Sequence, residues 1–306
     1  MEEMKNKKWK PEVIVLGPGG MKGFLEIGAL IKLSETGMLD RVNTYIGCSV
    51  GAIISLLMVA GFNPMEIIME AMNTQIFRDI LNISLSELQT KKEQFGLIST
   101  TKVRDQLTKK LVEKFGFVPT LKQLYIATGM TLITVSVNLD KDRTEYFSWK
   151  TEPDISAVEA TVLSMNIPFL FYKITYKGDV YIDGAFGNPY PVDICDDGET
   201  DILGISITTK HPYMVDATDT NNLRYIYKVL NASITQLKKR IEKNCTSKCK
   251  HLALYSPSMD TTGLTFDEDT KSEMIKIGYN LATGFIEQLE GEEIILVTSE
   301  EVPFSE

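Results

Sequence analysis

The stretch YIGCSVGAII, residues 45–54, decides how this chain is organised. It places a glycine two positions before Ser49 and another two positions after it, between a short apolar segment and a longer one. A serine nucleophile on a tight strand-to-helix turn needs this G-x-S-x-G pattern, because only glycine fits where the turn presses against neighbouring backbone. The turn exposes the hydroxyl at a helix N-terminus, whose dipole favours negative charge. The stretch predicts a strand, an elbow carrying Ser49 and a helix, with an ordinary glycine-rich turn as the alternative.

The segments around the elbow predict an α/β fold. Residues 12–17, EVIVLG, combine β-branched side chains with a glycine stop, as in a short buried strand, and residues 23–39 have the apolar spacing of a helix. Residues 43–47 repeat the strand pattern and residues 52–61 the helix pattern. Because this strand–helix order implies a parallel sheet covered by helices, we expect a three-layer fold with a mostly parallel central sheet.

Three later segments extend the predicted sheet. Residues 131–149 form a strand pair around a polar turn, residues 174–184 form a second pair around a Lys-Gly-Asp turn, and residues 201–209 form a buried strand. Helices are expected over residues 222–250 and 268–289. The last residues, EGEEIILVTSEEVPFSE (290–306), predict a strand followed by an acidic tail.

The chain is expected to form one domain over residues 1–306, because neither an internal repeat nor a low-complexity linker interrupts it. Its core covers about 12–207. A mainly helical and more polar segment, about 64–125, forms a helical cap or insertion, and about 208–306 form a C-terminal helical and acidic segment.

Composition and charge narrow the function classes. A formal net charge of -9 argues against nucleic acid as a partner. Four cysteines are too few and too unevenly spaced for a disulfide framework, which favours a reducing compartment. The N-terminus is charged where a secretory signal needs an apolar core, and the apolar part of the uncharged run 42–65 is only residues 52–62. We expect a cytoplasmic protein without signal peptide or transmembrane segment, which can still bind a membrane surface through apolar side chains.

The glycine-rich loop GPGGMKG, residues 17–23, is a candidate oxyanion hole between the first strand and the first helix. The backbone N–H groups of Gly19 and Gly20 can point at a tetrahedral oxyanion, whereas Pro18 has no N–H. Lys22 adds a positive charge beside the loop. A dinucleotide fingerprint would need glycine in place of Lys22, and a P-loop would need G-K-[ST], so nucleotide binding is the weaker interpretation.

The general base has few candidates, since the chain has only two histidines, His211 and His251. Asp183 ends a predicted strand and precedes Gly184, where a short side chain can point into a cleft. A partly desolvated carboxylate in contact with the serine can act as the base, although a turn aspartate is the ordinary alternative.

A metal site is not expected from the sequence. Cys245, Cys249 and His251 lie close together in the chain, but a fourth ligand and the usual C-x-x-C spacing are missing. They are therefore expected to be reduced thiols and a surface histidine.

Four blocks together resemble the patatin-like phospholipase family over about residues 12–207. GPGGMKG is similar to its oxyanion loop and GCSVGA to its nucleophile elbow. SMNIPFLF (164–171) is similar to its Ser-x-Ala-x-Pro-x-x-Phe block, and DGAFGNPYPV (183–192) to its Asp-Gly-Gly/Ala block. The chain departs from the family at Pro18, which replaces a common glycine, at Asn166, which replaces alanine, and at Pro189, which replaces asparagine. These departures concern substrate fit more than catalysis.

The resemblance implies a catalytic dyad of Ser49 and Asp183 without histidine, and an oxyanion hole formed by Gly19 and Gly20. The supporting residues that it implies are Gly17, Lys22, Gly23, Gly47, Gly51 and Gly184. The implied enzyme is a serine carboxylic ester hydrolase, a lipid acyl hydrolase of the phospholipase A or lysophospholipase type. It acts through an acyl-enzyme, needs no metal or other cofactor, and binds a glycerolipid at a membrane surface. Whether it requires a protein activator is left open.

Two rival functions remain at this stage. One is an α/β-hydrolase-type esterase with a Ser-Asp-His triad, and the other is a nucleotide- or lipid-binding module without catalysis. The basic stretch 238–250 has six basic residues against one acidic residue. It is either a contact for anionic headgroups or a solvated helix face.

Overall fold

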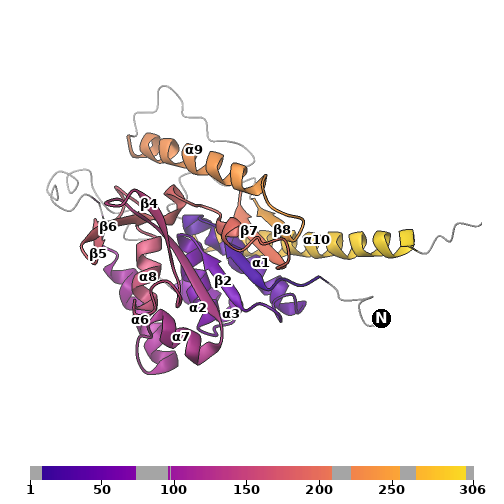
Figure 1. The fold of residues 1–306 in the computed structure, drawn as a ribbon, viewed down its shortest axis with the longest axis horizontal. Coiled ribbons are helices and arrows are strands. Elements are labelled where there is room, and N and C mark those ends of the chain that lie inside the picture. The colour runs from indigo at the N-terminus through magenta and orange to yellow at the C-terminus, as the bar shows by residue number, and fades with distance from the viewer. Residues whose placement is uncertain (1–8, 74–95, 97, 209–221, 256–266, 301–306) are drawn as a thin grey trace, which may run out of the picture.

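In the part of the chain that the structure describes, a central eight-stranded sheet is flanked by helices (Figure 1). It is seen in a computed structural model that describes residues 9–73, 96, 98–208, 222–255 and 267–300. The strands of this described part run in the order β5-β6-β3-β2-β1-β7-β8, and β4 pairs with β3. Their bounds are β1 Val13–Leu16, β2 Thr44–Gly47, β3 Thr131–Asn138, β4 Arg143–Phe147, β5 Ile174–Tyr176, β6 Asp179–Asp183, β7 Ile202–Ile207 and β8 Cys249–Leu254.

The centre of the sheet is parallel. β1 pairs in parallel with β2 and with β7, β2 pairs with β3, and β7 pairs with β8. The pairs β3–β4, β3–β6 and β5–β6 are antiparallel, as expected for the two predicted strand pairs. The mostly parallel sheet predicted from the strand–helix order is therefore confirmed.

Helices join the strands and cover them. The α-helices of the described part are α1 Gly23–Glu35, α2 Val50–Val59, α3 Pro64–Asn73, α6 Thr101–Phe115, α7 Leu121–Thr128, α8 Ala157–Ser164, α9 Asn222–Glu242 and α10 Glu268–Glu300. Short 3₁₀ helices are η1 Gly20–Lys22, η2 Gly184–Phe186 and η3 Pro191–Ile194.

The two faces of the sheet are covered unequally. On β1, Ile14 and Leu16 point into the main core, which receives apolar side chains from most of the α-helices. Val13 and Val15 point the other way, into a smaller core that contains Tyr190. This alternation is what a strand buried on both faces requires. The expected three-layer arrangement is confirmed. The layer that covers the face with Val13 and Val15 is thin and consists of η3, its neighbouring residues and the end of α9.

Close packing of α10 holds α1 in place. A Cβ atom added at Gly28 would lie 2.1 Å from the backbone oxygen of Ile275, and one at Gly278 would lie 2.0 Å from the oxygen of Leu25. Only glycine permits helices to approach this closely. The contact matters for function, because α1 carries the glycine-rich loop at its N-terminal end.

Two sequence predictions near the C-terminus are wrong. The predicted strand in residues 290–306 is instead the last part of α10, which continues to Glu300, while residues 301–306 lie outside the described part. No proline lies between Glu268, where α10 begins, and Pro303, so the β-branched run continues the helix that precedes it. The helix predicted over 222–250 ends at Glu242, and Cys249–Leu254 form the edge strand β8.

The segment 64–125 is helical where it is described. Val103, Leu107 and Leu111 of α6 are buried in the main core, so this helix belongs to the layer that covers the sheet. Residues 74–95 and 97 lie outside the described residues, and with them the part of the cap prediction that concerns them. Within the ranges described, no helix combines the length and apolarity needed to cross a bilayer.

Candidate active site

Ser49 occupies a strained elbow between β2 and α2. Its backbone has φ 58° and ψ −125°, a left-handed conformation that is rare for residues other than glycine. A Cβ atom at Gly47 would lie 2.4 Å from the Cα of Ala52, and one at Gly51 would lie 2.4 Å from the backbone oxygen of Leu16. The two glycines of the G-x-S-x-G pattern are therefore required by contacts with backbone, as the sequence predicted.

Asp183 is the last residue of β6 and lies beside this elbow. It is buried, with 1% of its surface exposed. Its Oδ1 accepts hydrogen bonds from the backbone N–H of Ala185 at 2.8 Å and from the thiol of Cys48 at 3.9 Å. The Ser49 side chain lies close enough to this carboxyl group to lower its pKa. The two residues predicted to act together lie side by side, although they are far apart in the sequence.

Burial changes the chemistry of Asp183. It raises the pKa of this carboxyl from 3.8 to about 6, and the neighbouring Ser49 side chain, the N–H of Ala185 and the thiol of Cys48 oppose the shift only in part. A carboxylate with a pKa near neutrality is a better proton acceptor than an exposed aspartate, while it remains ionised above that pH. The position thus suits a general base acting on the adjacent hydroxyl.

The block at 164–171 supports both members of the pair. The Oγ of Ser164 accepts a hydrogen bond from the backbone N–H of Ser49 at 3.3 Å. Asn166 is buried; its backbone oxygen accepts from the N–H of Asp183 at 2.9 Å and its side chain donates to the oxygen of Tyr181 at 2.9 Å. The sequence analysis did not predict these roles of Ser164 and Asn166, because only the family resemblance marked their block. It did not predict the contact of Cys48 with Asp183 either.

The glycine-rich loop lies against the elbow. A Cβ atom at Gly51 would lie 2.7 Å from the oxygen of Gly17, and one at Gly23 would lie 2.7 Å from the Val50 side chain. Gly20 has φ 55°, which favours glycine. The N–H of Gly17 donates to the oxygen of Ile205 at 3.1 Å, so it is not available to a ligand.

The next two glycines of the loop have backbone N–H groups that are not used within the described protein. In the described part of the chain, no protein acceptor binds the N–H of Gly19 or Gly20. Lys22 lies at the N-cap of α1 and is partly exposed. On the other side of the site, a Cβ atom at Gly184 would lie 2.2 Å from the oxygen of Val135, which explains the glycine after the aspartate.

Within the described part of the chain, no histidine lies beside Ser49 and Asp183. His211 lies outside the described part. His251 lies on β8, at the far edge of the sheet from β6, where its Nδ1 is 2.9 Å from the hydroxyl of Tyr190. It is partly exposed, which agrees with the expected surface histidine, and the β-strand turns its ring towards Tyr190. The expectation of free thiols agrees with the four unpaired cysteines.

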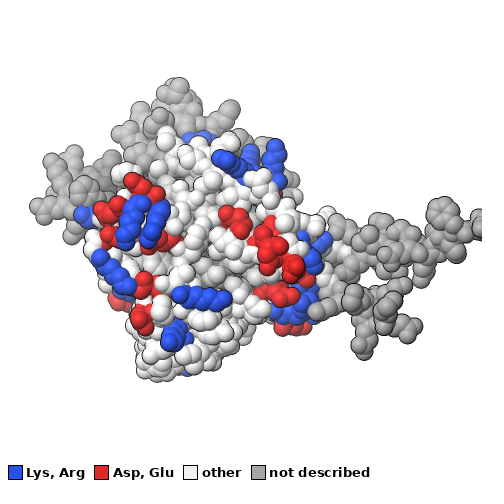
Figure 2. Space-filling model, viewed as in Figure 1, with Lys and Arg blue, Asp and Glu red and all other residues white. Residues whose placement is uncertain are grey.

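The basic stretch 238–250 is divided between several environments. The Nζ of Lys238 donates to the oxygen of Ile207 at 3.0 Å, and Lys248 pairs with Asp201 at 3.1 Å. Lys239 and Arg240 are exposed. Figure 2 shows basic side chains over the C-terminal part of α9 with acidic side chains beside them. The stretch therefore does not present a uniform basic surface.

The chain is similar in sequence to known lipid-hydrolysing proteins. The family model of the patatin-like phospholipases matches residues 14–196, more than half of the chain. A probable lipid hydrolase of Invertebrate iridescent virus 6 is 31% identical over 194 residues, which are 62% of this chain and 64% of that protein. A triacylglycerol lipase of Schizosaccharomyces pombe is 27% identical over 169 residues, which are 53% of this chain and 34% of the lipase. The chain thus spans less than two thirds of either relative.

Solved structures extend the likeness to the whole fold. VipD from Legionella pneumophila superposes with a TM-score of 0.58 at 15% identity, covering 93% of this chain and 68% of VipD. The type III effector ExoU of Pseudomonas aeruginosa superposes with a TM-score of 0.53 at 15% identity, covering 92% of this chain and 53% of ExoU. At this identity the likeness concerns the fold, while the family model covers the elbow, the glycine-rich loop and the buried aspartate. The chain belongs to the patatin-like phospholipase family.

Proposed function

We propose that this protein is a lipid acyl hydrolase of the phospholipase A or lysophospholipase type, which cleaves fatty-acyl esters of glycerolipids. One observation carries the proposal: the side chain of Ser49, held on a strained elbow, lies beside the buried carboxyl group of Asp183 and lowers its pKa. This pair supplies a nucleophile and a neighbouring base. The relatives described as a lipid hydrolase and a triacylglycerol lipase support a lipid ester as the substrate.

The reaction proceeds in two steps. Asp183 accepts the proton of Ser49 as the serine oxygen attacks the ester carbonyl, and the N–H groups of Gly19 and Gly20 donate to the oxyanion. The tetrahedral intermediate collapses, the alcohol part of the lipid leaves with the proton held by Asp183, and an acyl-enzyme remains. Asp183 then accepts a proton from water as the water attacks the acyl-enzyme, and it returns this proton to the Ser49 oxygen when the fatty acid is released. The N-terminus of α2 adds a favourable electrostatic field at Ser49.

The lipid is proposed to be met at a membrane surface. Phe169 belongs to the block 164–171 that supports the dyad, has 57% of its surface exposed and adopts φ 68°. A large apolar side chain held in the solvent near a buried ester-hydrolysing site suits insertion among acyl chains. The protein would then act as a peripheral enzyme.

The test is fatty-acid release from mixed phospholipid vesicles. Ser49→Ala and Asp183→Asn are each expected to lower the rate by at least about 1,000-fold, because each removes a group that reacts in the first step. The double variant His211→Ala/His251→Ala is the control and should retain most of the wild-type rate. Loss of activity in the histidine variant, with both dyad variants still active, would overturn the Ser-Asp assignment in favour of another base.

A further inference from the structure

A second group of reactive side chains lies away from the dyad, where α9 ends and β8 begins. Cys245 follows α9, Cys249 is the first residue of β8, and His251 is two positions further along that strand. Alternation along a strand places Cys249 and His251 on the same face. One ligand atom from each of the three residues lies within 4.8 Å of the other two.

The neighbouring contacts favour a coordinating histidine. The Nδ1 of His251 is 2.9 Å from the hydroxyl of Tyr190, a side chain that is fully buried. When Nδ1 carries the proton and donates to this hydroxyl, Nε2 keeps a free lone pair. Metal-ligating histidines almost always donate their other ring N–H in this way, which fixes the ring. Cys249 is itself buried, with 6% of its surface exposed.

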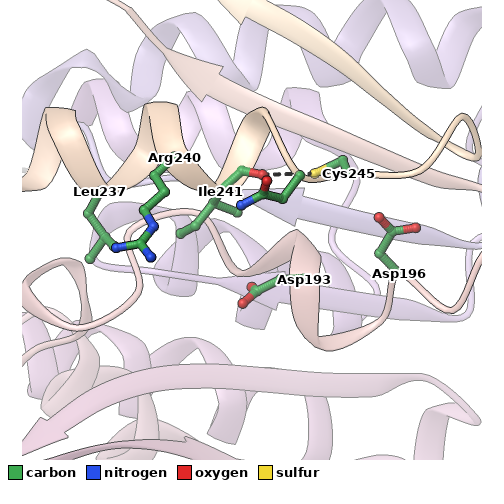
Figure 3. A pocket seen from close by; sticks show the side chains of 7 residues that line it. Asp193, Asp196, Leu237, Arg240, Ile241 and Cys245 are labelled. Atoms are coloured by element: carbon green, nitrogen blue, oxygen red, sulfur yellow. Dashed lines mark hydrogen bonds between the residues drawn. The ribbon is translucent and has the colours of Figure 1, made fainter.

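A cavity lies beside Cys245, one member of the cluster (Figure 3). It has a volume of about 190 Å³ and is lined by Cys245, with Asp193 and Asp196 on one side and Arg240 on the α9 side. In the figure, the thiol of Cys245 points to the backbone oxygen of Ile241, which accepts from it at 3.4 Å. The cavity gives a cation access to Cys245. The carboxylates of Asp193 and Asp196 outnumber the guanidinium of Arg240, so the charged side chains that line the cavity favour a cation.

We propose that Cys245, Cys249 and His251 bind one divalent cation of the Zn²⁺ type through two sulfurs and one imidazole nitrogen. Thiolate and imidazole are the ligands that Zn²⁺ prefers, and three protein ligands leave a fourth position for water. Ligand atoms around Zn²⁺ lie about 3.3–3.8 Å apart, as bond lengths of about 2.0–2.3 Å require. The three side chains therefore close in slightly on binding.

Binding is balanced by proton release. The two thiols each lose a proton and form metal–sulfur bonds, so one cation enters and two protons leave, with no oxidation. The bound ion would tie the end of α9 to β8 and, through His251, to Tyr190. The inference does not depend on the proposed function, since the mechanism uses none of these residues.

The first test uses the wild-type protein with Co²⁺ as the probe, under a reductant that does not bind metal. One equivalent of Co²⁺ should produce thiolate-to-cobalt charge-transfer absorption with an intensity typical of two thiolates, and one equivalent of Zn²⁺ should abolish it. Zn²⁺ should also raise the Tm, because it binds the folded protein. No charge-transfer band at one equivalent, or a band that Zn²⁺ does not remove, would overturn the proposal.

The second test compares variants. Cys245→Ser and Cys249→Ser should each lose the cobalt band and the Zn²⁺-dependent rise in Tm, while circular dichroism checks that they are folded. Cys195→Ser is the matched control, because Cys195 is partly buried but outside the cluster, and it should keep both signals. A band that persists in the folded double variant Cys245→Ser/Cys249→Ser, or that disappears in Cys195→Ser alone, would place the metal elsewhere.

Discussion

The buried carboxyl of Asp183 makes a prediction about stability as well as catalysis. Its pKa in the folded protein is about 6 against an ordinary value of 3.8, a difference of about two units. At about 1.4 kcal/mol for each unit, the charged carboxylate costs the folded state about 3 kcal/mol at pH 8. Because the folded pKa is raised, the carboxyl contributes stability only where it is protonated, and that contribution is lost as pH rises through about 6.

Replacing Asp183 by asparagine should therefore stabilise the protein at high pH more than at low pH. The amide has nearly the same shape, and its oxygen can still accept from the N–H of Ala185, so the packing changes little. The difference in free energy of unfolding, variant minus wild type, should grow by about 2–3 kcal/mol between pH 4 and pH 8. Most of this change should fall between pH 4 and pH 6.

The assay is urea unfolding followed by far-UV circular dichroism at several pH values. Ser49→Ala is the matched control: it is also expected to be inactive, but it keeps the carboxyl, so its stability should follow the pH dependence of the wild type or steepen it. A difference between Asp183→Asn and wild type that stays flat within about 0.5 kcal/mol from pH 4 to pH 8 would refute the reasoning. It would mean that the carboxyl is solvated in the native protein.

Three further predictions concern the site. The value of kcat/KM for a neutral ester should fall about tenfold for each pH unit below 6 and level off above it, because the base must be ionised; a pH–rate profile that is flat from pH 4.5 to 7 would contradict this. Gly51→Ala should abolish activity and lower the Tm by many degrees, since its Cβ would lie 2.4 Å from the oxygen of Leu16, whereas Gly17→Ala meets nothing closer than 3.6 Å and should change the Tm little in the same thermal scan. Ser164→Ala removes the acceptor for the backbone N–H of Ser49 and should cost about 1 kcal/mol in urea unfolding with a rate loss of about tenfold; unchanged kinetics would show that the elbow does not need this hydrogen bond.

Some features could be predicted from sequence because they depend on local rules. The G-x-S-x-G elbow has a backbone geometry that requires glycine at two positions. A short stretch of sequence is therefore enough to predict a strand, then Ser49, then a helix. The two strand pairs are marked by their polar turns, and the parallel centre follows from the alternation of strands and helices. Asp183 was identified by its place before Gly184 and by the family resemblance, not by any local rule for a base.

Other features depend on contacts between distant residues. The strand β8 was not predicted, and the helix predicted over 222–250 overlaps its first two residues, because β8 depends on hydrogen bonds with β7 rather than on its own sequence. The last part of α10 was predicted as a strand, because apolar β-branched residues suit both states. The raised pKa of Asp183 and the proximity of Cys245, Cys249 and His251 likewise arise only when the chain is folded.

The sequence by itself thus determined the nucleophile elbow, the glycine-rich loop and the α/β class, since each rests on residue types and spacings that act within a few positions. Only the tertiary structure decided which carboxyl group lies beside Ser49, how completely that carboxyl is buried and which strand forms the edge of the sheet. The physical reason is that burial and hydrogen bonding across the sheet are properties of the packed chain, and no short segment carries them.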